Sequence, residues 1–242
     1  MGSGDVPQIV NGLRSLPRAF VPGANLEEPF ELPSEELDKF RKVLRMGTGD
    51  QIAVLPNDGS LIVCRLEGRR AVPEGVFQPE TEATFRLTIA QALPKGDKLD
   101  EIVRCCTEIG VAGFLLFPSE RSVVRWDADK LAARLKRLEA IARESAEVSF
   151  RTRLPEFAVA ADLRDVLKRV PDAVVLSESE ALSGGLSPRG EGMTVVVGPE
   201  GGWAPRELTL IGERGVTLGP RVLRVDHAAA AAAAILLLQV NN

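Results

Sequence analysis

The stretch that most constrains the fold runs from Thr194 to Leu208 and reads TVVVGPEGGWAPREL. Its consecutive valines fit a strand that is buried on both faces, as strands of parallel sheets are. The glycines that follow allow the backbone to turn sharply and to approach a ligand closely. Pro205 suits the first turn of a helix, where its missing N–H costs nothing. A strand, a glycine turn and a helix in this order are typical of the place where open α/β sheets bind ligands.

A carboxylate, Glu200, stands in the middle of this turn. A phosphate-binding loop would not place a negative charge there, because like charges repel. The lysine and hydroxyl of a P-loop are missing, and the chain contains no G-x-G-x-x-G pattern. The turn therefore favours a neutral or cationic ligand. From this stretch alone, a plain strand–helix turn explains the pattern equally well.

Composition limits the class of protein. The chain has 242 residues and a net charge of −4, so nucleic acid could be bound only through a local basic patch. Three cysteines, two of them adjacent, and one histidine form no disulfide framework and no metal-ligand spacing, so no metal is expected. The N-terminus is polar, and the longest apolar run is shorter than the ~20 residues that cross a bilayer. We expect a cytoplasmic protein without a membrane partner.

The first part of the chain, residues 1–80, predicts a small, mostly β domain. Arg18 to Val21 fits a short first strand. Ser34 to Met46 fits a helix, with Ser34 as its N-cap. Two apolar runs flank Asp58–Gly59, which is a hairpin signal.

The second part, residues 81–242, alternates apolar strands with helices, which predicts an α/β domain with a parallel sheet. Helices are expected at Gly96 to Gly110, Asp127 to Ser149 and Asp162 to Arg169. Ala228 to Leu238 begins with a run of alanines, the best helix formers. It predicts a slender, buried C-terminal helix.

Further motifs accompany the glycine turn over most of the chain. They are GPEGG at Gly198–Gly202, LGPRVLR at Leu218–Arg224, RAFV at Arg18–Val21, VLRMGTGD at Val43–Asp50, KGDKLDEIVRCCTEIGV at Lys95–Val111, SERSVV at Ser119–Val124 and RTRLPE at Arg151–Glu156. Their order resembles the RsmE-type 16S rRNA methyltransferases of the SPOUT class. The resemblance implies a homodimeric, S-adenosylmethionine-dependent enzyme that methylates N3 of a uridine in the 16S rRNA of the small ribosomal subunit. It also implies an N-terminal PUA-like β-barrel that positions RNA, and a SPOUT-type parallel sheet with a C-terminal trefoil knot.

In this family the cofactor contacts come largely from the backbone of three loops. In this chain they correspond to the loop after AVVLS, the GPEGG loop and the LGPR loop. The expected contacts are Leu176, Gly198, Pro199, Glu200, Gly201, Leu218, Gly219, Arg221 and Leu223. The alternative is that the glycines only turn the chain.

Methyl transfer to N3 of uridine requires the N3 proton to leave and the negative charge on the base to be stabilised. Charge stabilisation is expected from three arginines: Arg18, Arg221 and Arg224. Glu200, Asp226 and His227 are candidate proton acceptors, His227 because histidine titrates near neutral pH. Alternatively, Asp226 is the N-cap of the last helix and His227 lies in its first turn, which residue type alone favours.

RNA binding would use the basic stretch 121–153, which holds nine lysines and arginines against five acidic residues. The expected RNA contacts are Arg121, Arg125, Arg151 and Arg153, joined by Arg18 and Arg45 from the N-terminal domain. A solvated helix face with interleaved charges is the alternative for each of them. Trp126 or Trp203 could stack on a base, although burial is the commoner fate of a tryptophan.

Three segments depart from the family's pattern. RVDHA at Arg224–Ala228 replaces a run like Arg-Thr-Glu-Thr-Ala, EVSFR at Glu147–Arg151 replaces Glu-Gln-Ser-Gly-Arg, and Lys39 replaces a histidine. These differences bear on the identity of the methylated base more than on the binding of the cofactor. They keep two alternatives open: a SPOUT enzyme that acts on another base or a ribose hydroxyl, and a non-catalytic RNA-binding ribosome-assembly factor.

Overall fold

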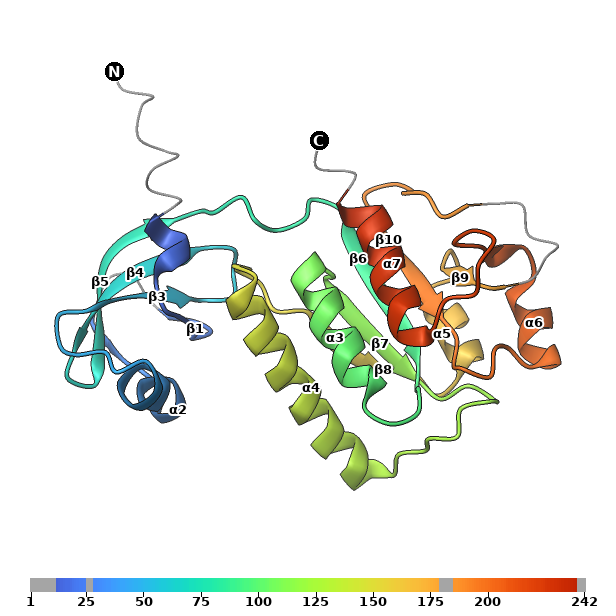
Figure 1. The fold of residues 1–242 in the computed structure, drawn as a ribbon, viewed down its shortest axis with the longest axis horizontal. Helices are drawn as coiled ribbons and strands as arrows, with labels where there is room; N and C mark the ends of the chain where they lie inside the picture. The colour runs from blue at the N-terminus through green and yellow to red at the C-terminus, as the bar shows by residue number, and fades with distance from the viewer. Residues whose placement is uncertain (1–11, 25–27, 179–184, 239–242) are drawn as a thin grey trace, which may run out of the picture. The chain divides into compact units, whose positions relative to one another are not determined.

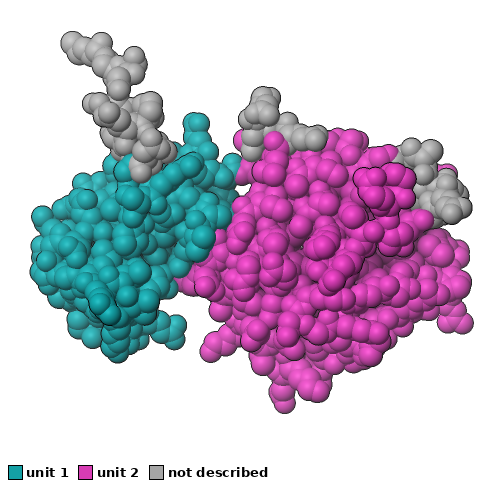
Figure 2. Space-filling model, viewed as in Figure 1, with its two compact units in different colours: residues 1–82, 146–154 teal, residues 83–145, 155–242 magenta. Residues whose placement is uncertain are grey.

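The computed structural model describes residues 12–24, 28–178 and 185–238, and the chain divides into two compact units (Figures 1 and 2). Unit 1 comprises residues 1–82 and 146–154, and unit 2 comprises residues 83–145 and 155–242. The first division lies two positions beyond the expected boundary. Residues 146–154 also belong to unit 1, whereas the sequence predicted a single boundary between the two domains.

In the described part of unit 1, five strands form one sheet in the order β1 (Arg18–Phe20), β3 (Gln51–Leu55), β4 (Leu61–Glu67), β5 (Arg70–Phe77) and β2 (Phe30–Glu31). β1 pairs with β3 in parallel, and the other pairs are antiparallel. The expected hairpin joins β3 to β4. It turns at Asn57 and Gly59, whose φ angles are 71° and 100°.

The expected helix from Ser34 to Met46 is shorter and less regular than the sequence predicts. It forms as α2 (Ser34–Asp38), followed by a π-helical turn, η1 (Lys39–Val43). Pro33 occupies the N-cap position and no side chain caps the helix, so the prediction for Ser34 was wrong. The wider turn accompanies burial of Phe40 in the core of unit 1.

The carboxylate of Glu82 is one of the groups that hold residues 146–154 in unit 1. It accepts hydrogen bonds from Nη2 of Arg151 at 2.9 Å, the amide of Thr152 at 2.7 Å and the amide of Arg153 at 3.0 Å. The Arg151 side chain is only 5% exposed. A buried guanidinium of this kind needs an anionic partner, and Glu82 supplies it.

Two departures from the family's pattern lie together in unit 1. Phe150, in one of these segments, has a positive φ of 62°, a conformation that favours glycine. Its ring is buried, and the guanidinium of Arg18 lies 4.6 Å from the ring centroid. Lys39 lies 2.8 Å from Oε2 of Glu147. Burial raises the pKa of Glu147 above its ordinary value, although Lys39 opposes that shift.

Unit 2 contains a sheet of six described strands, parallel throughout, which confirms the expected α/β class. The strand order is β11 (Gly215–Val216), β9 (Val174–Leu176), β10 (Gly192–Val197), β6 (Arg86–Ala92), β7 (Gly113–Phe117) and β8 (Glu156–Val159). On β10, Val195 and Val197 pack into one core cluster and Val196 into another. The valine run is therefore buried on both faces, as the sequence predicted.

Helices cover both faces of this sheet (Figure 1). One face is covered by α3 (Lys98–Ile109), the part of α4 (Ala128–Val148) that lies in unit 2, and α7 (Val225–Leu237). The other face is covered by α5 (Leu163–Arg169) and α6 (Pro205–Ile211). None of the helices in the described ranges is long and apolar enough to span a bilayer.

Helix α7 is slender and packs directly against α3. Ala229, Ala232 and Ala233 are fully buried along it. At the end of α3, Gly110 has a φ of 112°, and a Cβ there would lie 3.7 Å from a methyl group of Leu237. Small side chains thus permit the close approach that the alanine run predicted.

Candidate functional site

The loops singled out by the sequence follow three adjacent strands of unit 2. β9 ends at Leu176, β10 at Val197 and β11 at Val216, and the three strands are parallel neighbours. Carboxyl ends of parallel strands lie at one edge of a sheet, which is where α/β proteins bind ligands. In the first loop, residues 179–184 lie outside the described part of the chain.

Trp203 fixes the glycine loop to the strand beside it. Its Nε1 donates to the carbonyl of Leu176 at 2.9 Å, and its ring stacks on Phe117. A Cβ on Gly198 would lie 3.1 Å from the indole ring, so glycine lets the loop lie against the ring without displacing it. Trp203 is buried, and this resolves one alternative left open by the sequence: it packs in the core and does not stack on a base.

Glu200 is paired within the protein. Its Oε1 accepts from Nζ of Lys98 at 2.7 Å and from the amide of Lys95 at 3.1 Å. Burial alone would raise the pKa of Glu200, but these hydrogen bonds outweigh it and the pKa is lowered. The carboxylate therefore stays ionised and joins the glycine loop to the start of α3. Its charge is already balanced by Lys98, which changes the expectation that it faces a cationic ligand.

A second brace comes from the loop that follows β7. Nη1 of Arg121 donates to the carbonyl of Gly201 at 2.8 Å. The amide of Glu120 donates to Oε1 of Glu207 at 3.0 Å, and Oε2 of Glu207 accepts from the amide of Ala204 at 2.9 Å. The guanidinium of Arg121, expected on RNA, thus holds the glycine loop. Glu207 was missed, although its place in the first turn of a helix after Pro205 signals such a cap.

The third loop contributes leucines and one obligatory glycine. Leu218 and Leu223 are half-buried, and Leu218 packs against the core cluster beneath α7. Gly219 has a φ of 115°, and its amide donates to Oγ1 of Thr217 at 3.1 Å. Arg221 is exposed at the tip of the loop.

Arg224, Asp226 and His227 gather at the start of α7. Arg224, not Asp226, is the N-cap, so the expected capping role of Asp226 was wrong. Oδ1 of Asp226 instead accepts from Nε of Arg224 at 3.2 Å, and Oδ2 lies 3.9 Å from Nε2 of His227. Burial alone would raise the pKa of Asp226, but the bond from Arg224 contributes to a net lowering. The His227 side chain is 68% exposed.

Four further arginines expected at the site, Arg18, Arg45, Arg151 and Arg153, belong to unit 1, whereas Arg125 belongs to unit 2. The Arg18 guanidinium donates to the carbonyls of Leu16 at 3.3 Å and Glu147 at 3.1 Å, and burial lowers its pKa. Arg151 is held by Glu82, which removes it from the set that can face RNA. Arg153 donates to the carbonyl of Asp58 but is exposed, and so is Arg45.

The cysteines do not provide a nucleophile. Cys64, Cys105 and Cys106 are all free thiols. Burial raises the pKa of Cys64 to about 12 and that of Cys105 to about 11, and it also raises the pKa of Cys106. A thiolate is therefore scarce near neutral pH, and covalent catalysis through sulfur is disfavoured.

Comparison with known proteins gives a consistent answer. The family model for the RNA methyltransferase domain matches residues 81–237. Ribosomal RNA small subunit methyltransferase E of Bacillus subtilis is 34% identical over 219 residues, which cover 82% of this chain and 86% of the relative. The protein of the same name from Mycobacterium bovis is 32% identical over 206 residues, covering 78% of this chain and 79% of the relative.

Solved structures agree with the sequence relatives. The structure of a ribosomal RNA small subunit methyltransferase E from Neisseria gonorrhoeae, bound to S-adenosyl methionine, superimposes with a TM-score of 0.80 at 28% identity. It covers 90% of this chain and 95% of the other. The glycine loop, the LGPR loop and α7 all lie within residues 81–237, the range that the family model matches. On these grounds the chain belongs to the ribosomal RNA small subunit methyltransferase E family of RNA methyltransferases.

Proposed function

We propose that this protein transfers the methyl group of S-adenosylmethionine to N3 of a uridine in the 16S rRNA of the small ribosomal subunit. The observation that carries the proposal is that three parallel neighbouring strands end at Leu176, Val197 and Val216, at one edge of the sheet. Family membership supports the reaction class and the RNA substrate. The cofactor-bound relative supports the choice of methyl donor.

The residues at this edge fit the cofactor. Leu176, Leu218 and Leu223 are buried or half-buried and offer apolar contact to an adenine ring. A Cβ on Gly219 would have no atom within 4 Å, so the loop leaves open space beside its backbone. Arg221 is exposed and cationic, and it suits the carboxylate of an amino-acid group. When bound, S-adenosylmethionine supplies a methyl group that an anionic ring nitrogen can attack.

The glycine loop would complete this pocket with its backbone. Gly198, Pro199 and Gly201 form the turn after β10, and Trp203 and Arg121 hold it in place. Because these braces lie within the protein, the loop is preorganised before a ligand binds. Preorganisation lowers the entropy that binding would otherwise lose.

On the base side, we assign proton removal from N3 to His227. Asp226 is a weaker proton acceptor, because Arg224 contributes to keeping its pKa low. To the exposed guanidinium of Arg224 we assign the stabilisation of negative charge on the base carbonyls. Glu200 and Arg18 are occupied by bonds within the protein, and we assign them positioning roles.

We further propose the finer features that the resemblance implies. Unit 2 would carry the C-terminal trefoil knot of the SPOUT class, and unit 1 would be a PUA-like barrel that positions RNA through Arg45 and Arg153. The protein would act as a homodimer. The all-parallel sheet of unit 2 and the separate five-stranded sheet of unit 1 support the division into two domains of these kinds.

The test is to map modified nucleosides in 16S rRNA from a strain that lacks the gene. We expect one 3-methyluridine to be lost and to return with the wild-type gene. An unchanged 3-methyluridine level would refute the proposal. Loss of another modified nucleoside would instead favour a SPOUT enzyme with a different target. No change, together with no S-adenosylmethionine binding in calorimetry, would favour a non-catalytic ribosome-assembly factor.

A further inference from the structure

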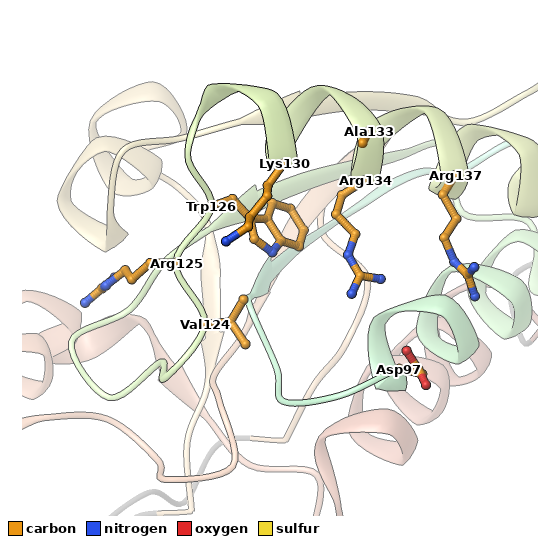
Figure 3. A pocket seen from close by; sticks show the side chains of 8 residues that line it. All are labelled: Asp97, Val124, Arg125, Trp126, Lys130, Ala133, Arg134 and Arg137. Atoms are coloured by element: carbon orange, nitrogen blue, oxygen red, sulfur yellow. The ribbon is translucent and has the colours of Figure 1, made fainter.

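A cavity of about 730 Å³ lies within unit 2, between the start of α3, the loop before α4 and the first turns of α4 (Figure 3). Its size is in the range of sites that hold a nucleotide-sized ligand, roughly 300–1,000 Å³. Its polar and aromatic lining consists of four cations, one carboxylate and one indole: Arg125, Lys130, Arg134, Arg137, Asp97 and Trp126.

Two of these cations are not engaged by the protein. Among the described residues, Arg125 and Arg134 make no hydrogen bond or ion pair, and Arg134 extends from α4 toward the start of α3 (Figure 3). Arg137, in contrast, donates to Oδ2 of Asp100 at 2.6 Å and 2.8 Å. Lys130 lies 3.7 Å from Asp127, an exposed pair that contributes little. The cavity thus presents positive charge that an anion would neutralise.

The other two polar groups suit a nucleobase. Trp126 is half-buried, so it offers part of its ring to a ligand, and aromatic rings stack on bases of every kind. Asp97 occupies the N-cap position of α3, where aspartate ordinarily accepts a hydrogen bond from the helix. Here its side chain accepts none, and its carboxylate lies at the wall of the cavity (Figure 3).

Two segments that line this cavity also carry residues that contact the glycine loop of the proposed methyl-transfer site. Asp97 precedes Lys98, whose Nζ lies 2.7 Å from Glu200 in the glycine loop. Trp126 follows Arg121 in one loop, and Arg121 holds the carbonyl of Gly201 at 2.8 Å. Residues close in the chain to two cavity-lining residues therefore hold the glycine loop within unit 2.

We propose that this cavity binds a second nucleotide of the substrate RNA, near the one that is methylated; this rests on the proposed function above. The phosphate lies against Arg125, Lys130 and Arg134, and the base stacks on Trp126. An exocyclic amino group of the base donates to Asp97. Adenine, cytosine and guanine carry such a group and uracil does not, so the cavity prefers those three bases to the base that the enzyme methylates.

The test uses the two tryptophans of the full-length chain as separate reporters. Trp126 lines the cavity, and Trp203 lies against Gly198 and Leu176 at the proposed cofactor loops. Indole N–H resonances are followed by NMR during titration with GMP, AMP, CMP, UMP, inorganic phosphate or S-adenosylmethionine. We expect the three amino-bearing nucleotides to shift Trp126 saturably, and S-adenosylmethionine to shift Trp203.

Variants locate the binding. Arg134→Ala should weaken the Trp126 response at least about fivefold, as expected when a charged phosphate contact is lost. Asp97→Ala should remove the preference over UMP. The matched control is Arg164→Ala, an exposed arginine on α5, which covers the opposite face of the sheet; it should change nothing.

Three results would overturn the inference: no Trp126 response to any nucleotide, an equal response to UMP or to phosphate alone, or a response that Arg134→Ala leaves intact. The two reporters keep the failures distinct. A silent Trp126 with a normal Trp203 response to S-adenosylmethionine overturns the second-nucleotide site alone. A Trp203 that does not respond to S-adenosylmethionine contradicts the proposed function.

Discussion

Replacing Glu200 by glutamine removes one charge from the glycine loop and keeps the size of the side chain. The wild-type carboxylate makes an ion pair with Lys98 at 2.7 Å and accepts from the amide of Lys95 at 3.1 Å. The two side chains of the pair are 25% and 31% exposed, so the pair is worth about 1 kcal/mol, the upper end for partly exposed pairs. Weakening the amide bond from charge-assisted to neutral adds about 0.5 kcal/mol.

The sum, about 1.5 kcal/mol, corresponds to a factor of about ten in an equilibrium constant. If cofactor binding requires the loop in its observed position, the Glu200→Gln variant should bind S-adenosylmethionine roughly tenfold more weakly in calorimetry. Lys98→Met should have a similar effect, and the double variant should be little worse than either single one, because both remove the same interaction. Glu213→Gln, an exposed carboxylate in the same unit, is the matched control.

Two outcomes would refute this reasoning. An affinity within twofold of wild type for a folded Glu200→Gln protein would mean that the tie to Lys98 does not position the loop. A loss far greater than tenfold for Glu200→Gln, with none for Lys98→Met, would mean that the carboxylate touches the cofactor directly. That second result would support the prediction made from the sequence, that Glu200 contacts the ligand.

The ion pair between Glu200 and Lys98 also predicts a pH dependence, because the pKa of Glu200 is lowered in the folded protein. The affinity for S-adenosylmethionine, measured by calorimetry, should be constant above a glutamate's ordinary pKa of about 4.3 and should fall only below it. A decline beginning near neutral pH would point to another group. Glu82→Ala removes the carboxylate that holds Arg151 and should lower the stability of unit 1 by about 2–4 kcal/mol. With a urea m-value of about 1.5 kcal/mol per M, the midpoint of the urea unfolding of unit 1, followed by circular dichroism, should fall by about 2 M. The unfolding followed by tryptophan fluorescence should not change, because both tryptophans lie in unit 2. His227→Ala should lower kcat at least about 100-fold and leave the Kd for S-adenosylmethionine within about twofold, because the side chain acts on the base; an unchanged kcat would place the proton acceptor elsewhere.

Local features of the fold were readable from the sequence. Val195 to Val197 are buried, Pro205 opens α6, and Gly110 ends α3 in a left-handed conformation. Each depends on residues within a few positions, so periodicity and residue type suffice. The exact start of α7 was less readable: it lies at Val225, which moved Asp226 from the N-cap into the first turn. Helix boundaries are sensitive to such shifts because adjacent residues compete for the cap.

The sequence by itself thus determined the parallel α/β class, the glycine loop after a buried strand and the slim last helix. Only the tertiary structure decided what the charged residues do. Lys98 lies 102 positions from Glu200, Arg121 lies 80 positions from Gly201, and Arg151 lies 69 positions from Glu82. Local patterning carries no information about such pairs, since a charge finds its partner through the packing of the whole domain. The sequence predicted that the Glu200 carboxylate faces a ligand, whereas in the folded protein it binds Lys98 and joins the glycine loop to the start of α3.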